Sequence, residues 1–247
     1  MKKVPLRLHL EELQQRLRGS VVFFVSGVVI AFLLRRFLLD LVKRPHIWVM
    51  NKLHLPSTVY VLNYQDHFIS QFKICLLAGF IFSFPLILYQ LMRFIGAGLW
   101  PKERHVVWTY LFAFLILFTM GTIFSYFVLL PYGLYFLSLY GLQVGLQPFI
   151  NFGSYVSLFV LLITLGGISF ELPLTMVLLV QLGLVSAEDL GRRRRLAILL
   201  IFIIAAILTP PDPITQLLMA FPMIFLYEAG LFFSKLVERN RRPSVAY

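Results

Sequence analysis

Glu171 is a carboxylate in surroundings where charge is costly. It is the only charged side chain between His105 and Glu188, in a stretch composed mostly of Phe, Leu, Val and Ile. An ionised acid at the centre of a bilayer costs about 2.5 to 3.5 kcal/mol on insertion scales, so such a residue marks a functional site by default. Three roles are open to it: a structural hydrogen bond within a helix bundle, docking of a polar group on a partner helix, and a step in a proton relay.

Two further glutamates suit a different chemistry, the recognition of arginine. Glu12 lies in HLEELQQR and Glu103 in WPKERH, segments otherwise dominated by basic and polar side chains. A carboxylate can bind a guanidinium group through both oxygens, so the two sites suit an arginine-bearing peptide. A structural alternative stays open, because Glu12 could pair with Arg16 one helical turn away and Glu103 with a neighbour in its loop.

The chain lacks the motifs of common catalytic and metal sites. There is no glycine-rich phosphate loop, no HExxH and no serine elbow, and the five histidines show no metal-ligand spacing. Cys75 is the single cysteine and lies inside an apolar run. We therefore expect no enzymatic activity, no catalytic residues, no metal and no cofactor.

Long apolar helices must position these carboxylates. Of 247 residues, 60% are hydrophobic and only 13% are charged. Uncharged runs near the ~20 residues that a spanning helix needs predict an all-α, polytopic integral membrane protein with six transmembrane helices. The predicted spans are 19–37, 72–94, 106–130, 155–181, 196–209 and 214–234.

The predicted organisation has three parts. Residues 1–18 form a cytoplasmic amphipathic helix, 19–236 the six-helix transmembrane domain and 237–247 a cytoplasmic tail. Fifteen basic residues in the N-terminal segment, the 102–104 loop, the 192–195 cluster and the C-terminal segment oppose five around the first loop on the other side. This asymmetry places both termini in the cytoplasm. The net charge of +11 thus reflects topology and contact with lipid headgroups, and implies no nucleic-acid partner.

The hairpin formed by the last two spans is short. The fourteen residues of 196–209 make only about 21 Å of helix against a hydrocarbon core of about 30 Å. After the turn, Asp212 is placed as the N-cap of the last helix and Pro213 at its first position. We expect local bilayer thinning, or burial of this hairpin against other helices, to relieve the mismatch.

Four segments carry a resemblance to a known family. The runs HLEELQQRL, PLILYQLMRFIGAGLWPKER, SFELP and LTPPD, in that order, resemble the TatC subunit of the twin-arginine protein translocase across nearly the whole chain. The resemblance implies a six-helix protein of the bacterial inner (plasma) membrane that recognises twin-arginine signal peptides. It implies single-span partners of the TatA and TatB types, and the export of folded proteins.

The resemblance also implies roles for individual residues. The signal-peptide site is expected to involve Glu12, Glu103, Arg16, Phe94, Lys102 and Arg104. The intramembrane and partner-binding residues are expected to be Glu171, Thr209, Gln216 and Asp212. One position departs from the family pattern, because Gln14 stands where many relatives have arginine after Glu-Leu.

An ion-coupled small-molecule transporter that uses Glu171 is the alternative function. Only Glu228 and Asp212 offer further carboxylates in the last spans and their turn, so a continuous proton path is not visible. The chain also shows no repeat between its halves and no pair of broken helices around Glu171. These features favour the translocase interpretation.

Overall fold

The computed structural model describes residues 6–97, 104–146, 149–208 and 213–241. It forms two compact units. One consists of residues 1–44, 59–115 and 151–160, and the other of 45–58, 116–150 and 161–247. The described residues contain no β-strand, only an isolated bridge between Tyr60 and Asn151.

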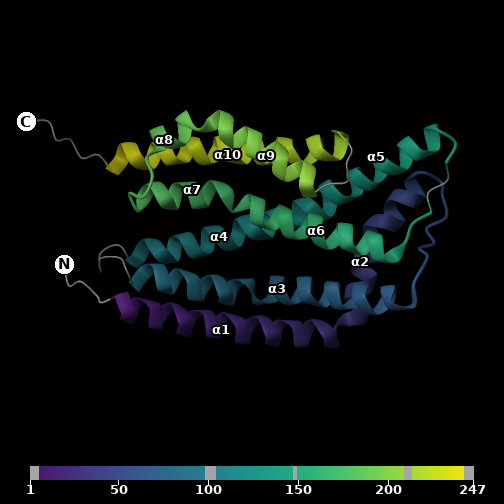
Figure 1. Cartoon of the computed structure of the whole chain (residues 1–247), viewed down its shortest axis with the longest axis horizontal. Coiled ribbons are helices and arrows are strands. Elements are labelled where there is room, and N and C mark those ends of the chain that lie inside the picture. The colour runs from purple at the N-terminus through teal and green to yellow at the C-terminus, as the bar shows by residue number, and fades with distance from the viewer. Residues whose placement is uncertain (1–5, 98–103, 147–148, 209–212, 242–247) are drawn as a thin grey trace, which may run out of the picture. The chain divides into compact units, whose positions relative to one another are not determined.

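The first unit is built on two long helices that lie side by side, α1 (Leu6–Leu33) and α3 (Tyr64–Ala97) (Figure 1). Gly27 of α1 and Gly79 of α3 allow the backbones of the two helices to come into contact. A Cβ on Gly27 would lie 2.6 Å from the Gly79 carbonyl oxygen, and a Cβ on Gly79 would lie 2.7 Å from the Val28 backbone. Small residues allow such close packing of helices where lipid is the solvent.

Three other helices begin in the first unit and continue into the second. They are α2 (Arg35–Lys52), α4 (Arg104–Phe124) and α6 (Phe152–Phe170). Within the first unit, Tyr155 of α6 donates a hydrogen bond to the Val42 carbonyl of α2, and Lys73 of α3 donates one to Ser157 of α6 at 2.9 Å. These bonds join the start of α6 to α2 and α3.

The second unit contains the π-turn η1 (Ser125–Leu129) and the helices α5 (Leu130–Gln143), α7 (Leu172–Gln181), α8 (Ala187–Arg192), α9 (Arg194–Leu208) and α10 (Pro213–Arg241). Helix α10 packs along α7 and α9. Gly230 permits the contact with α7, since a Cβ there would lie 2.8 Å from the Pro173 Cα.

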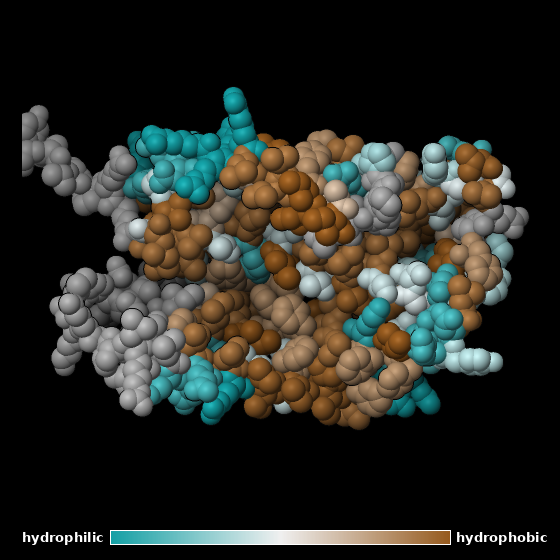
Figure 2. Space-filling view, in the orientation of Figure 1, coloured by the Kyte–Doolittle hydropathy of each residue, from teal (hydrophilic) through white to brown (hydrophobic). Residues whose placement is uncertain are grey.

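The all-α, polytopic fold is confirmed, and each of the six predicted spans corresponds to described helices. Five stretches are long and apolar enough to cross a bilayer: Glu11–Leu33, Tyr64–Phe94, Trp108–Gln143, Phe152–Gln181 and Thr215–Arg239. The remaining predicted span, 196–209, corresponds to α9, whose 15 residues make about 22 Å of helix. Figure 2 shows hydrophobic side chains along the middle of these helices and hydrophilic ones gathered near the start of α1 and over α8.

Several helix boundaries differ from the sequence expectation. Residues 1–18 and 19–37 were expected as a surface helix and a separate span, but α1 runs through the junction between them without a break. The third predicted span ended at residue 130, directly before Pro131. Pro131 lies in the first turn of α5, directly after the π-turn, where a missing N–H is tolerated, and the helix continues to Gln143. Helix α10 likewise extends past residue 236.

Candidate functional site

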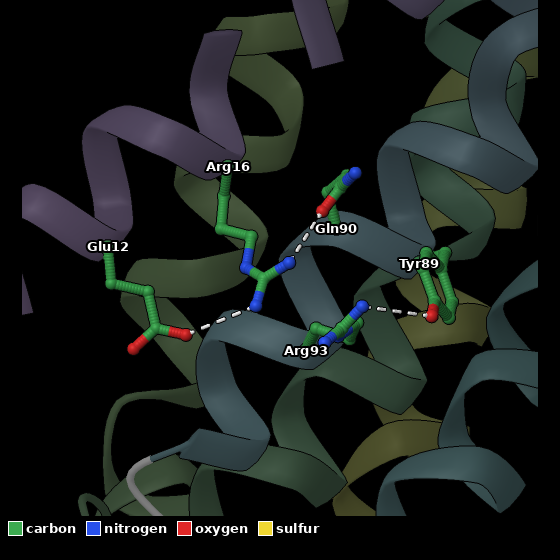
Figure 3. A network of polar contacts seen from close by, with 5 residues as sticks. All are labelled: Glu12, Arg16, Tyr89, Gln90 and Arg93. Carbon is green, nitrogen blue, oxygen red and sulfur yellow. Dashed lines mark hydrogen bonds and ion pairs between the residues drawn. The ribbon is translucent and has the colours of Figure 1, made fainter. Parts of the chain in front are cut away.

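Glu12 lies in a polar network that joins α1 to α3 (Figure 3). The Arg16 guanidinium donates to Glu12 Oε1 at 3.4 Å, one turn along α1, and to Gln90 Oε1 of α3 at 3.3 Å. Neither side chain is fully buried, since the exposed fractions are 30% for Glu12 and 21% for Arg16. The i,i+4 pairing considered from the sequence is therefore present, but Arg16 also binds a second helix.

The close packing of α1 on α3 creates this network. A Cβ on Gly19 would lie 3.1 Å from Gln90 Nε2, so the glycine makes room for the amide beside Arg16. Arg16 holds only one oxygen of Glu12, and Oε2 makes no hydrogen bond with the described residues. The arrangement can accept a guanidinium group from outside, because Oε2 is available and Oε1 has a second lone pair.

Gln90 was not among the residues expected from the sequence. The sequence nevertheless marks Gln90 as unusual, because it is a polar amide within the apolar run LILYQLM of the predicted second span. Polar side chains in such spans bond to neighbouring helices rather than face lipid. The sequence could not name its partner, however, because Arg16 is 74 residues away.

The remaining residues of the expected signal-peptide site lie around the α3–α4 connection. Phe94 is half-buried near the end of α3. Arg104 is the first residue of α4, but its side chain is not among those that the structure describes. Glu103 and Lys102 lie outside the described residues. Helices α3 and α4 meet close to this connection, where the rings of Tyr89 and Trp108 lie 5.8 Å apart.

Tyr89 also holds a cation on the exposed side of α3. Arg93 donates a hydrogen bond to the Tyr89 hydroxyl at 3.3 Å and lies 5.6 Å from the centre of its ring. Arg93 therefore adds a positive charge near the Glu12 network (Figure 3), and it too was absent from the expected site.

Glu171 stands at the junction between α6 and α7, in the second unit. Pro173 has no N–H to continue the α6 hydrogen-bond ladder, so the helix is interrupted after Phe170 and restarts at Leu172. The Glu171 carbonyl accepts hydrogen bonds from the N–H and hydroxyl of Thr175, at 2.9 and 2.8 Å. These bonds satisfy the backbone at the kink.

The Glu171 side chain is shielded from solvent. Both carboxylate oxygens are buried, and no described side chain donates a hydrogen bond to them. The backbone of Phe118 in α4 faces them. Close packing excludes larger groups nearby, since a Cβ on Gly167 would lie 2.7 Å from the Phe118 ring. A buried polar group of this kind is costly to leave without a donor, so a polar group supplied by another molecule would be stabilised there.

Of the expected partner-binding residues, the structure describes Glu171 and Gln216. Gln216 donates a hydrogen bond from Nε2 to the Phe202 carbonyl at 3.1 Å and so joins α10 to α9. Thr209 and Asp212 lie outside the described residues. Pro213 is the first residue of α10, as expected for a proline after an N-cap.

Comparisons with known proteins identify the family. Residues 8–222 match the family model described as Sec-independent protein translocase protein (TatC). The TatC protein of Campylobacter jejuni is 36% identical, covering 90% of each chain, and that of Aquifex aeolicus is 34% identical, covering 97% of this chain and 98% of its own. The chain belongs to the TatC family.

A solved structure of the TatC family has the same fold. The crystal structure titled Twin Arginine Translocase Receptor TatC superposes with a TM-score of 0.82 at 33% identity, covering 93% of this chain and 99% of that one. The chain is therefore a multi-pass translocase subunit of the bacterial inner membrane and not an enzyme. Membership of the TatC family favours the translocase over the small-molecule transporter considered from the sequence.

The TatC-family chain shows no metal centre in the part that the structure describes. No three side chains of His, Cys, Asp or Glu come together there. Glu228 does not extend a carboxylate path from Glu171 either. It is paired with Arg194 at 2.7 Å, and its side chain is 39% exposed.

Proposed function

We propose that this chain recognises twin-arginine signal peptides through Glu12 and Glu103, and that Glu171 and α9 dock single-span partner subunits. The Glu12 network carries the first half of the proposal. In an isolated ion pair on a helix surface, Arg16 and Glu12 would bind only each other. Here Arg16 also donates a hydrogen bond to Gln90, and Oε2 of Glu12 stays available.

Charge pairing supplies specificity rather than most of the affinity. An exposed ion pair contributes about 0.2 to 1 kcal/mol, so two pairs fall short of the roughly 4 kcal/mol that even millimolar binding requires. Burial of about 160 Å² of apolar surface from the signal would add a further 4 kcal/mol at 25 cal/mol per Å². We therefore infer that the carboxylates select arginine while the apolar segment of the signal packs against the helices.

The arginine preference follows from the geometry at Glu12. A guanidinium group can bind Oε2 and share Oε1 with Arg16, since its N–H groups lie in one plane. A lysine ammonium is a point charge with no such fork. We expect replacement of the signal arginines by lysine to weaken binding while the apolar contacts persist.

Site-directed crosslinking tests this assignment. A photo-reactive residue in the signal peptide, next to its arginine pair, should crosslink to the parent chain in membrane vesicles. Glu12→Gln and Glu103→Lys should each lose most of that product. Glu11→Gln is the matched control, because it removes the same charge from the neighbouring exposed residue of α1. Normal crosslinking by Glu12→Gln, or an equal loss with Glu11→Gln, would show that the assignment is wrong.

The second half of the proposal rests on a buried carboxyl group and an apolar face. Glu171 has no side-chain donor among the described residues, so a polar group on a partner helix would satisfy it. Helix α9 exposes Leu199, Ile203 and Ile207 along one face, with exposed fractions of 55%, 44% and 75%. Spacing of four residues makes this face continuous, which suits packing by a single helix in the membrane.

Partner docking and proton chemistry at Glu171 can be separated by substitution. Glu171→Gln keeps a polar side chain that cannot titrate, whereas Glu171→Ala removes it. If Glu171 docks a partner helix, the Gln variant should retain coprecipitation with TatA-type and TatB-type subunits and export activity, and the Ala variant should lose both. An inactive Gln variant with normal partner binding would favour proton chemistry instead.

A further inference from the structure

A groove of about 790 Å³ lies at the C-terminal end of α10, where α8 and the first residue of α9 line its other sides. Helix α8 is fastened to α10 at two points. The Ala187 N–H donates to Glu238 Oε2 at 3.0 Å, and the Tyr227 hydroxyl donates to the Leu190 carbonyl at 2.7 Å. These bonds lie three turns apart on α10, so the groove is bounded by a fixed wall.

The groove carries an excess of positive charge. Arg192, Arg194, Lys235 and Arg239 line it together with Glu188 and Glu238. Arg192 is paired with Glu188 and Arg194 with Glu228, each at 2.7 Å. Lys235 and Arg239 form no ion pair with the described residues. They are four residues apart on α10, so they project from the same face and can bind one anion together.

The groove also lies where the apolar sequence of two helices ends, which is the expected boundary of the membrane. Its α10 residues belong to the last turns of the candidate span Thr215–Arg239, and the apolar sequence of α9 starts two residues after Arg194. Buried Leu231 forms the apolar floor. On the same turns of α10, Phe232 and Leu236 are 60% and 42% exposed. A phosphate bound there would have apolar surface next to it, which suits acyl chains and not a soluble anion.

We propose that this groove binds the headgroup phosphate of an anionic phospholipid, with Lys235 and Arg239 as its ligands. Basic pockets between helix ends on the cytoplasmic side are suited to such headgroups, because two cations neutralise the phosphate while the chains stay in the hydrocarbon. Hydrophilic side chains are indeed gathered over α8 and the adjoining part of α10 (Figure 2). The bound headgroup would lie between α10 and α8, which both line the groove.

Competition between lipids tests the site. The purified full chain is mixed with equimolar phosphatidylglycerol and phosphatidylcholine in neutral detergent, and bound lipid is counted by native mass spectrometry. We expect preferential retention of phosphatidylglycerol by the parent chain, and a loss of about tenfold or more in Lys235→Gln/Arg239→Gln. Arg36→Gln/Arg44→Gln is the control, because it removes two exposed cations from α2.

Each other outcome overturns the proposal. Equal retention by the Lys235→Gln/Arg239→Gln variant would show that these residues are not the ligands, and an equal loss in the control would show that net charge alone attracts the lipid. Displacement of the lipid by the same concentration of inorganic phosphate would assign the groove to a soluble anion. Lys235→Arg/Arg239→Lys keeps both charges and should bind normally, which separates loss of the site from misfolding.

Discussion

The Gln90 amide gives the sharpest test of how the Glu12 network works. Gln90 accepts a hydrogen bond from Arg16 at 3.3 Å and thereby draws the guanidinium away from Glu12. In Gln90→Ala, Arg16 would be left with Glu12 alone, and their 3.4 Å ion pair would tighten. An incoming arginine would then have to displace Arg16 from the carboxylate.

The size of the effect follows from the geometry. Hydrogen bonds to charged groups contribute about 1.5 to 3 kcal/mol when short and buried. The Arg16–Gln90 bond is long and only partly buried, so about 1 kcal/mol is reasonable, which corresponds to about fivefold in the dissociation constant. We therefore expect Gln90→Ala to weaken signal-peptide binding about fivefold, measured with a labelled peptide on nanodisc-embedded protein.

A double-mutant cycle shows whether the effect passes through Arg16. In the Arg16→Gln background, Gln90→Ala should change binding by less than about twofold. Gln15→Ala, on an exposed position of α1, is the control and should leave binding unchanged. A fivefold loss that persists without Arg16, or no loss in the parent, would refute the proposed role of Gln90.

Three further predictions concern packing and pH. Gly79→Ala would place a Cβ 2.7 Å from the Val28 backbone, so its melting temperature in detergent should fall with a destabilisation of about 1 to 3 kcal/mol, whereas Gly133→Ala, with its nearest neighbour at 3.9 Å, should be tolerated. Burial lowers the pKa of His46 below 6.5, although a backbone hydrogen bond at Ser57 opposes the shift, so the stability that depends on neutral His46 is complete above pH 6.5 and declines below it. Amide protection across α2, corrected for intrinsic exchange, should therefore fall as the pH is lowered below about 6.5. A fall of equal size in His46→Asn would contradict this. Gln216→Leu removes the bond to the Phe202 carbonyl and should broaden the distance distribution between spin labels on α9 and α10, and an unchanged distribution would show that the bond does not hold the hairpin.

The sequence predicted most of the helices because bilayer insertion depends on local composition. Apolar runs, Pro173 in the first turn of α7 and the Ser186 N-cap of α8 are local signals, and each corresponds to an observed element. The boundaries that differ are those where a proline did not interrupt the helix or where no local signal marks a boundary. Pro131 falls in the first turn of α5, where proline does not disrupt the ladder, and no local feature separates the predicted surface helix from the first span.

The candidate site was only partly predictable. Glu12 and Glu171 were identified because charge is conspicuous in apolar or basic surroundings, and the pairing of Glu12 with Arg16 follows from helical periodicity. Gln90 could not be assigned to Arg16, since their contact depends on how closely α1 approaches α3. That distance is set by Gly19, Gly27 and Gly79, whose role appears only when the helices are packed.

The sequence by itself therefore determined the class of protein, the number of spans and which charged residues lie in surroundings where their charge is unusual. These properties depend on composition and on separations of a few residues, which a helix converts directly into geometry. Only the tertiary structure decided which oxygen of Glu12 stays available, that no described side chain satisfies Glu171, and that Lys235 and Arg239 face a groove against α8. Those properties depend on contacts between helices far apart in the chain, where a shift of about an ångström makes or breaks a hydrogen bond.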